Sequence, residues 1–177
     1  MTVPFVRRGD RLLDVGCYDR SLIDRVLPRI RSAVGIDTNV SPASDGCVEI
    51  LLGCFPDDHQ FDDACFDCIT MLAVLEHVDN PTVLATEYER ILAPGGRLVL
   101  TVPHPTVDVV LDALMFLRLA DGMAADEHHG FDVERTRSLF ETAKLSLYRE
   151  RRFQLGLNRL YVFEKPRSAT CSGGARG

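Results

Sequence analysis

The sequence predicts a single α/β domain with a doubly wound, mostly parallel sheet. The first observation is a short apolar strand, an abrupt turn at Gly16 and a helix within residues 11–30, which is the opening of a βαβ unit. The second is the alternation of strand-like and helix-like stretches over the first hundred residues. The third is a pair of β-rich runs at 145–153 and 159–165, which should form a hairpin and give the sheet an antiparallel edge.

The composition is that of an ordinary soluble globular protein. The chain has 177 residues, of which 46% are hydrophobic and 26% charged, enough for one domain with a sizeable core. Its net charge of −6 gives no attraction to nucleic acid or to an anionic membrane. No apolar run approaches a membrane span, and no signal peptide opens the chain. We therefore expect a cytoplasmic protein with a small-molecule partner, and a homodimer is compatible with these features.

The six cysteines indicate reduced thiols rather than disulfides or a metal centre. Most of them stand in apolar strand-like stretches, as buried thiols of a reducing compartment do. Cys65 and Cys68 form a C-x-x-C pair, but no second pair follows at zinc spacing. We expect no metal site.

The helix after the glycine turn carries apolar residues at three- and four-residue spacing between positions 22 and 30. Ser21, with Asp24 three residues later, predicts a capping pair at its start. Pro28 should end or kink the helix, because proline cannot continue the helical hydrogen bonds.

A second apolar strand, residues 34–37, ends in an acid about 20 residues beyond the glycine turn. At this separation the carboxylate of Asp37 is expected to accept hydrogen bonds from the two hydroxyls of a ribose. A turn or helix-cap role for the same residue stays open, because many strands end in aspartate.

The remaining parallel strands are expected at 47–52, 66–71 and 97–102. The polar stretch 38–46 lacks helical periodicity, so a loop should replace the usual helical crossover there. A helix should begin at Pro81 with Asn80 as its cap. Residues 93–96, with the sequence APGG, predict a hard turn before the last parallel strand.

The second half is less regular. Residues 107–119 are apolar on most sides, which is typical of a helix that is buried or that covers a pocket or a partner surface. A loop at 121–130 and a helix from 132 or 133 to 143 are expected next. Residues 168–177 are small and polar and should be disordered, so the domain should span residues 1–167.

Four motifs occur in a specific order: LLDVGC at 12–17, GID at 35–37, a strand ending in LEHV at 66–78, and ILAPGG before the strand that ends at Pro103. In combination they resemble the successive motifs of class I S-adenosylmethionine-dependent methyltransferases. The resemblance implies a Rossmann-like, mostly parallel seven-stranded sheet with an antiparallel last strand. It also implies the strand order 3-2-1-4-5-7-6, with the terminal hairpin supplying the last two strands.

The resemblance further implies which residues contact S-adenosylmethionine. Residues around the glycine turn would flank the methionine portion, and the acid after the second strand would bind the ribose. The next residue and the loop after the third strand would contact the adenine, and residues after the fourth strand would form the floor beneath the sulfonium. In chain order these residues are Asp14, Gly16, Cys17, Asp37, Thr38, Cys54, Phe55, Leu72 and Ala73.

The first loop departs from the family pattern G-x-G-x-G. Gly16 is kept, whereas Tyr18 and Arg20 replace the second and third glycines. A dinucleotide would lose the bare backbone that its pyrophosphate needs, but S-adenosylmethionine carries no phosphate. Tyr18 should then point away from the ligand. Cys54 stands where the family often has an acid for the adenine amino group.

Methyl transfer is an in-line displacement that needs a positioned acceptor and a dry site, and a hydroxyl acceptor also needs a base. His104 directly follows the last parallel strand at the ligand end of the sheet, and His128 and His129 stand in the loop expected to cap the pocket. We predict these three as catalytic residues. His77 is predicted to be structural, and a surface role for any one histidine stays open.

Three functions are compatible with the sequence. The first is a methyltransferase that acts on a small-molecule acceptor such as a sugar or another secondary metabolite. The second is a non-catalytic binding module with a methyltransferase fold, which would act through a partner. The third, a nicotinamide-dependent oxidoreductase, is disfavoured by the missing phosphate-loop glycines.

Overall fold

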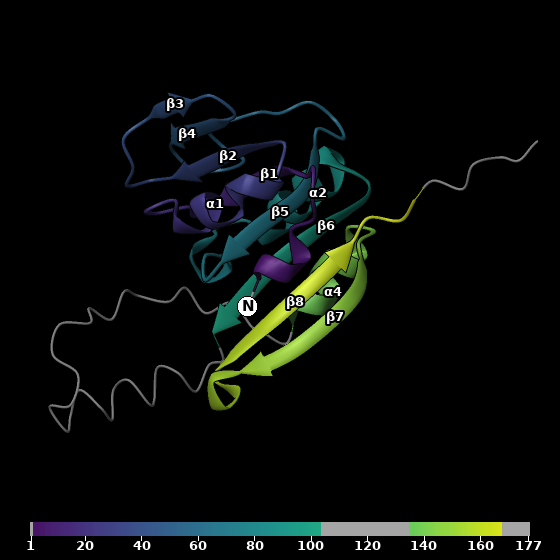
Figure 1. The fold of residues 1–177 in the computed structure, drawn as a ribbon. Helices are drawn as coiled ribbons and strands as arrows, with labels where there is room; N and C mark the ends of the chain where they lie inside the picture. Colours follow the sequence, from purple (N-terminus) through teal and green to yellow (C-terminus); the bar gives the residue numbers. More distant parts are fainter. Residues whose placement is uncertain (1, 104–134, 168–177) are drawn as a thin grey trace, which may run out of the picture.

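The computed structural model describes residues 2–103 and 135–167, which form one eight-stranded sheet in the order β3-β4-β2-β1-β5-β6-β8-β7 (Figure 1). The five strands from β4 to β6 in this order are parallel, and β8 lies antiparallel to β6. The strands are β1 (Arg11–Val15), β2 (Ser32–Asp37), β3 (Ala43–Asp45), β4 (Val48–Leu52), β5 (Phe66–Leu72), β6 (Leu92–Pro103), β7 (Ser146–Phe153) and β8 (Asn158–Glu164).

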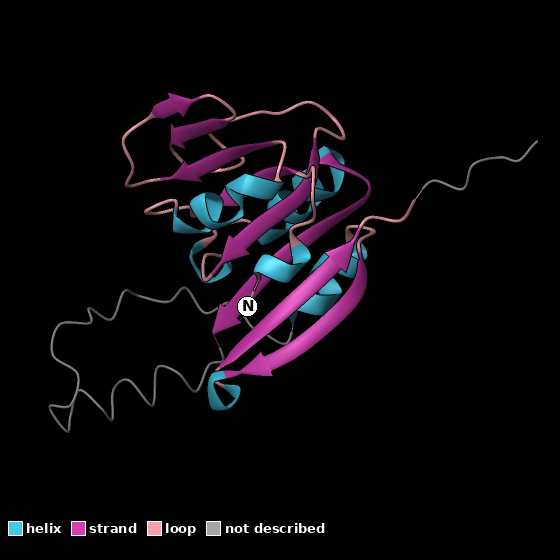
Figure 2. Ribbon diagram, in the orientation of Figure 1, coloured by secondary structure: helices cyan, strands magenta, loops and turns pink. Residues whose placement is uncertain are grey.

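Helices cover both faces of this sheet (Figure 2). The α-helix α1 packs with the N-terminal residues on one face, and α2 and α4 pack on the other (Figure 1). The α-helices are α1 (Ser21–Val26), α2 (Pro81–Ile91) and α4 (Thr136–Thr142), and the 3-10 helices are η1 (Val3–Phe5), η2 (Leu27–Arg29), η3 (Leu75–His77) and η5 (Gln154–Gly156). Among these described helices none is long and apolar enough to cross a membrane.

Each face of the sheet has its own hydrophobic core. On the α2 face, Tyr88 of α2 is fully buried and stacks on Phe55 with ring centroids 5.7 Å apart. On the same face, Phe140 of α4 packs against Phe163 of β8 at 5.1 Å. The α1 face is closed by Ile23 and other apolar side chains from α1 and the strands beneath it. Burial on both faces explains why β1 and β5 read as continuous apolar runs in the sequence.

The predicted strand order is confirmed. If β3 is set aside, the order of the remaining strands is 3-2-1-4-5-7-6, and the last strand is antiparallel. No helix lies between residues 38 and 47, as expected. The Asn80 side chain caps α2 by accepting a hydrogen bond from the backbone N–H of Val83, and Pro28 stands in η2, just after α1 ends.

Three local predictions are corrected. The stretch expected to be only a loop contains β3, a short polar strand paired antiparallel with β4. Residues 93–96, expected to form a hard turn before the strand, lie within β6, whose pairing with β5 skips from Leu92 to Arg97. Helix α1 has no Ser21–Asp24 capping pair, since the Asp19 side chain accepts the Ser21 N–H and Asp24 pairs with Arg20 instead.

Gly16 fixes the path of the chain as it leaves β1. Its φ of +77° lies in the left-handed region, and a Cβ built there would stand 2.3 Å from Cγ2 of Val74. A side chain at this position would therefore meet both backbone strain and a packed neighbour.

We expect Gly16→Ala to be more destabilising than Gly9→Ala, a matched control. Gly9 has a similar φ of +82° but nothing within 4 Å of a built Cβ. Gly9→Ala should lower the free energy of unfolding by about 1–2 kcal/mol, because alanine is strained in the left-handed region. Gly16→Ala should lower it by roughly 1–3 kcal/mol more, because its side chain also overlaps Val74. Chemical denaturation measures both free energies of unfolding. The double variant Gly16→Ala/Val74→Ala should recover much of the extra loss, and equal costs for the two single variants would contradict the account.

Candidate functional site

A cavity of about 420 Å³ opens at the carboxyl ends of β1, β2 and β4. Strand β1 has β2 on one side and β5 on the other. The strands that follow β1 are therefore added first on the side of β2 and later on the side of β5, so the strand order reverses at β1. Open α/β sheets bind their ligands at such a topological switch point, and the volume suits a nucleoside-sized molecule. The cavity is therefore the candidate active site.

The first wall is the glycine turn, which hydrogen bonds to the end of β2. The backbone N–H groups of Gly16 and Cys17 both donate to the carbonyl of Ile36, at 2.8 and 3.2 Å. One step further, the N–H of Tyr18 donates to Oδ2 of Asp37 at 2.9 Å. These bonds hold the loop after β1 against the last residues of β2.

Asp37 is held with both carboxylate oxygens oriented. In addition to the bond from Tyr18, its Oδ1 accepts the backbone N–H of Asn39 at 2.8 Å. Each oxygen has a second lone pair, so the carboxylate can still accept two hydroxyl hydrogen bonds from a ligand. Because Asp37 lines the cavity, this is the arrangement that ribose binding needs.

The replaced glycines keep the backbone shape that glycine normally supplies. Tyr18 has φ +44° and Arg20 has φ +56°, both in the left-handed region. Such a conformation costs about 1–2 kcal/mol in a residue with a side chain, and the bond from Tyr18 to Asp37 offsets part of this cost. The Tyr18 side chain is exposed and does not line the cavity, as predicted from the sequence.

Asp14 lies buried behind the glycine turn. Its Oδ1 accepts a hydrogen bond of 2.6 Å from the Thr70 hydroxyl of β5. Burial raises the pKa of Asp14 to about 7, and the charge of Asp37 adds to this while the bond from Thr70 opposes it. The carboxyl group can therefore change its charge near neutral pH, next to the site.

The second wall follows β4. Cys54 and Phe55 line the cavity, and the Cys54 N–H donates to Oδ2 of Asp58 at 2.7 Å. Burial raises the pKa of the Cys54 thiol, which keeps the thiol neutral at physiological pH. The ring of Phe55 is fixed by its stack on Tyr88.

The third wall comes from the segment after β5. Val74 packs against Gly16, and the cavity is also lined by His77, Val78 and Asp79. Leu72 and Ala73, which are predicted to form the floor beneath the sulfonium, do not line the cavity. The 3-10 helix η3 follows at once and brings the later residues to the surface of the cavity instead.

Apart from Leu72 and Ala73, which do not line the cavity, the predicted site residues divide into three groups. Five line the cavity: Gly16, Asp37, Thr38, Cys54 and Phe55. Asp14 and Cys17 are buried beside it without lining it. His104, His128 and His129 lie outside the described residues.

The charge around the cavity is negative. Asp37, Asp57 and Asp79 line it, and no arginine or lysine is among the described lining residues. Polyphosphate groups bind where basic side chains or bare helix N-termini meet them. These carboxylates accept hydrogen bonds and carry negative charge, so they instead favour a ligand with positive charge and hydroxyl groups.

A family model described as a methyltransferase domain matches residues 3–153. Among curated proteins, the chain is 30% identical over 124 residues to the uncharacterized 37.1 kDa protein in transposon TN4556 of Streptomyces fradiae, covering 58% of this chain and 35% of that one. It is 30% identical over 109 residues to the ubiquinone biosynthesis O-methyltransferase of Dechloromonas aromatica, covering 52% of this chain and 44% of that one. The chain thus spans less than half the length of these two relatives.

Solved structures show the same fold. A SAM-dependent methyltransferase from Methanosarcina mazei superposes with a TM-score of 0.67 at 20% sequence identity. The match covers 93% of this chain and 96% of that one. At this identity the likeness supports the fold and not the choice of substrate.

The buried carboxyl group of Asp14 predicts a distinctive pH dependence of stability. Its folded-state pKa of about 7 lies above the unfolded value of about 3.9. The folded state therefore keeps a proton that the unfolded chain loses between these values, and the free energy of unfolding falls as pH rises through this window. Asp14→Asn should match wild type near pH 4 and be more stable by on the order of 2–4 kcal/mol at pH 8.

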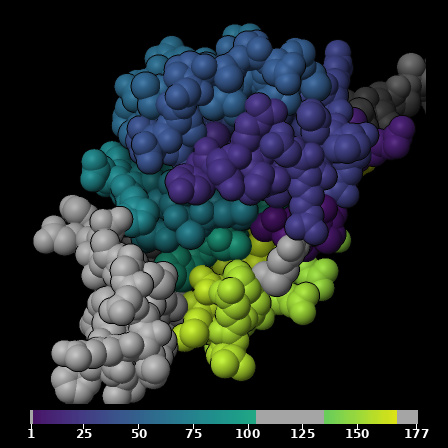
Figure 3. Space-filling model, turned by 60° about the vertical axis from the view of Figure 1, so that its left-hand side comes forward, coloured from purple at the N-terminus to yellow at the C-terminus, as the bar shows by residue number. Residues whose placement is uncertain are grey.

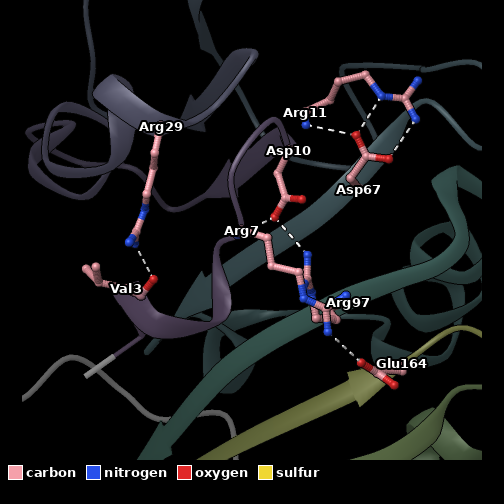
Figure 4. Close-up of polar contacts among 8 residues, drawn as sticks. All are labelled: Val3, Arg7, Asp10, Arg11, Arg29, Asp67, Arg97 and Glu164. Atoms are coloured by element: carbon pink, nitrogen blue, oxygen red, sulfur yellow. Dashed lines mark hydrogen bonds and ion pairs between the residues drawn. The ribbon is translucent and has the colours of Figure 1, made fainter.

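Asp67→Asn is the control with the opposite sign. Hydrogen bonds from Arg11 lower the pKa of Asp67 (Figure 4), so its loss should destabilise the protein at pH 7 and matter less as pH falls toward 3. Denaturant titrations from pH 4 to 8 measure the Asp14 effect, and a shorter series down to pH 3 measures the control. An Asp14→Asn difference that does not change with pH would show that the carboxyl group titrates normally.

Proposed function

Because the chain belongs to the methyltransferase domain family, a class of S-adenosylmethionine-dependent enzymes, we propose that it transfers the methyl group of S-adenosylmethionine to a small-molecule acceptor. The observation that carries this proposal is the acidic cavity beside the glycine turn. Asp37 is held there by two backbone donors with lone pairs left for ribose hydroxyls.

The residues of the cavity fit this cofactor. S-adenosylmethionine carries a sulfonium and an ammonium group and no phosphate, so the three lining aspartates attract it. Thr38 follows Asp37 at the end of β2, and Cys54 and Phe55 follow the neighbouring strand β4, so a planar base could pack against the apolar surface that they give the cavity. NAD carries two phosphates, and no described lining residue is a lysine or arginine that could pair with them.

When bound, the cofactor supplies an electrophilic methyl group, and the protein's part is to hold the acceptor in line and keep water out. Val74 and Val78 line the cavity on the side of β5 and give it apolar surface. Burial, and to a smaller extent the charge of Asp37, raise the pKa of Asp14 to about 7, so ionisation of Asp14 near neutral pH would change the negative potential beside the site.

The small-molecule acceptor is supported by the relative in ubiquinone biosynthesis, which is an O-methyltransferase. A hydroxyl acceptor needs a base, and we propose His104, His128 and His129 for this role. His104 directly follows Pro103 in the sequence, and Pro103 is the last residue of β6, whose carboxyl end lies at the same end of the parallel strands as the cavity. His77 lines the cavity and is the alternative base among the described residues.

The two other functions have less support. A non-catalytic binding module was suggested by the lost glycines, but Tyr18 and Arg20 keep the left-handed backbone of the loop. A nicotinamide-dependent oxidoreductase would need phosphate contacts that the acidic cavity does not offer. An assay with radiolabelled methyl donor and a panel of phenols, sugars and amines distinguishes turnover from binding alone.

We expect Asp37→Ala to weaken binding of S-adenosylmethionine by roughly 10- to 100-fold for each ribose hydrogen bond that it removes. Each charge-assisted hydrogen bond to the ribose contributes about 1.5–3 kcal/mol, and tenfold in affinity corresponds to about 1.4 kcal/mol. Isothermal titration calorimetry measures the affinity. Asp45→Ala is the matched control, because Asp45 is an exposed acid on β3 that does not line the cavity. Equal affinity of the Asp37→Ala and Asp45→Ala variants for S-adenosylmethionine would show that Asp37 does not bind the cofactor.

The catalytic proposal predicts a loss of rate without a loss of binding. Replacing the base with alanine should lower turnover of a hydroxyl acceptor by about 10²–10⁴, while affinity for the cofactor changes little. The variants His104→Ala, His128→Ala, His129→Ala and His77→Ala are compared across pH 6–9, with His59→Ala as a control outside the cavity. Wild-type turnover in all four variants at positions 104, 128, 129 and 77 would show that none of these histidines is the base, and that methyl transfer rests on positioning of the acceptor alone.

A further inference from the structure

A second cavity, of about 350 Å³, lies between the N-terminal residues and the strands β6, β8 and β7, and shares no lining residue with the candidate active site. In Figure 3 the N-terminal residues, in dark purple, lie against the yellow-green strands of the C-terminal hairpin. Four arginines and two aromatic residues line most of this basic cavity: Arg7, Arg97, Arg149, Arg151, Phe5 and Tyr148.

Arg97 is the buried base of this basic cavity. It is only 2% exposed, and its Nη2 donates to Oδ2 of Asp10 at 2.8 Å (Figure 4). Its Nε and Nη1 atoms are buried and have no hydrogen-bond partner among the described residues. A guanidinium group that is left with unpaired N–H donors away from water is costly, unless a ligand accepts those bonds.

The charge of the basic cavity is only partly balanced. Arg7 pairs with Glu164 at 3.2 Å, and its backbone N–H donates to Asp10 at 2.6 Å (Figure 4). Arg149 and Arg151 have no carboxylate partner in the described part of the chain, and Arg149 lies over the ring of Phe5 at 5.9 Å. The four arginines therefore exceed the two acids that face them.

Protection of a sheet edge explains part of this pattern. Strand β7 is the edge strand, and exposed charges on an edge prevent pairing with other chains. That explanation accounts for Arg149 and Arg151, but an edge needs no buried arginine beneath it. Arg97 stands two strands away from the edge, in β6, and faces the same cavity.

We propose that the basic cavity binds the phosphate group of a small molecule. Guanidinium groups recognise phosphate through paired N–H bonds, and a dianion would match the excess positive charge. The rings of Phe5 and Tyr148 flank the cavity and offer surface for a base or another ring attached to the phosphate. The source of the group is therefore either free phosphate or a nucleotide.

The test compares ligand binding to variants of neighbouring arginines on β7. Arg151 lines the basic cavity, whereas Arg152 is the next residue and is also exposed but does not line it. Successive strand residues point to opposite faces of the sheet, so Arg152→Gln removes an equal charge on the face away from the basic cavity. Binding of inorganic phosphate and of adenosine monophosphate is measured by calorimetry and phosphorus NMR, with chloride at equal ionic strength as the reference.

Wild type should bind phosphate saturably, and Arg149→Gln and Arg151→Gln should each weaken binding about tenfold, while Arg152→Gln changes it less than twofold. Tighter binding of adenosine monophosphate identifies a nucleotide as the source, and equal binding identifies free phosphate. Affinity for S-adenosylmethionine should stay the same in all three variants. The proposal is overturned if phosphate binds no better than chloride, or if Arg152→Gln weakens binding as much as Arg151→Gln does.

Discussion

The active-site end of the molecule depends on the hydrogen bonds that join the glycine turn after β1 to the end of β2. Gly16 and Cys17 donate to the carbonyl of Ile36, and Tyr18 donates to the carboxylate of Asp37. This junction brings the two strand ends together and orients the acid at the mouth of the cavity. Only glycine fits at position 16, because its φ is positive and Val74 occupies the space of a side chain.

The junction also sets the electrostatics of the site. It places Asp37 close enough to Asp14 that the charge of Asp37 adds to the larger effect of burial in raising the pKa of Asp14. Asp57 and Asp79 add negative charge from two further walls, without a described lysine or arginine in the lining. A cavity of this kind attracts a cation with hydroxyl groups and repels a pyrophosphate. The change from G-x-G-x-G to a single glycine is consistent with such a ligand.

The position of Asp37 could be predicted because it ends an apolar run after the glycine turn, whereas the order of the strands was implied by the resemblance to class I methyltransferases. The sequence did not predict β3, whose three residues are exposed and show no apolar pattern, and which forms through pairing with β4. The two residues expected to form the floor, Leu72 and Ala73, are not among those that line the cavity. The residues that reach the cavity after β5 depend on how η3 turns the chain, and a sequence pattern does not encode that direction.

The basic cavity could not be predicted from the sequence either. Arg97 follows a glycine pair at the start of a predicted strand and reads as an ordinary surface charge. Its burial results from the N-terminal residues that fold over β6 and supply Asp10. Contacts between residues so far apart in the chain depend on tertiary packing, and a local sequence pattern does not predict them.

The measurement that tests the central claim most directly is calorimetry of the wild-type protein with three ligands. S-adenosylmethionine and its demethylated product should each bind at one site, and NAD should not compete with them. Saturable binding of NAD, together with no binding of S-adenosylmethionine, would contradict the account of an acidic cavity organised by the glycine turn.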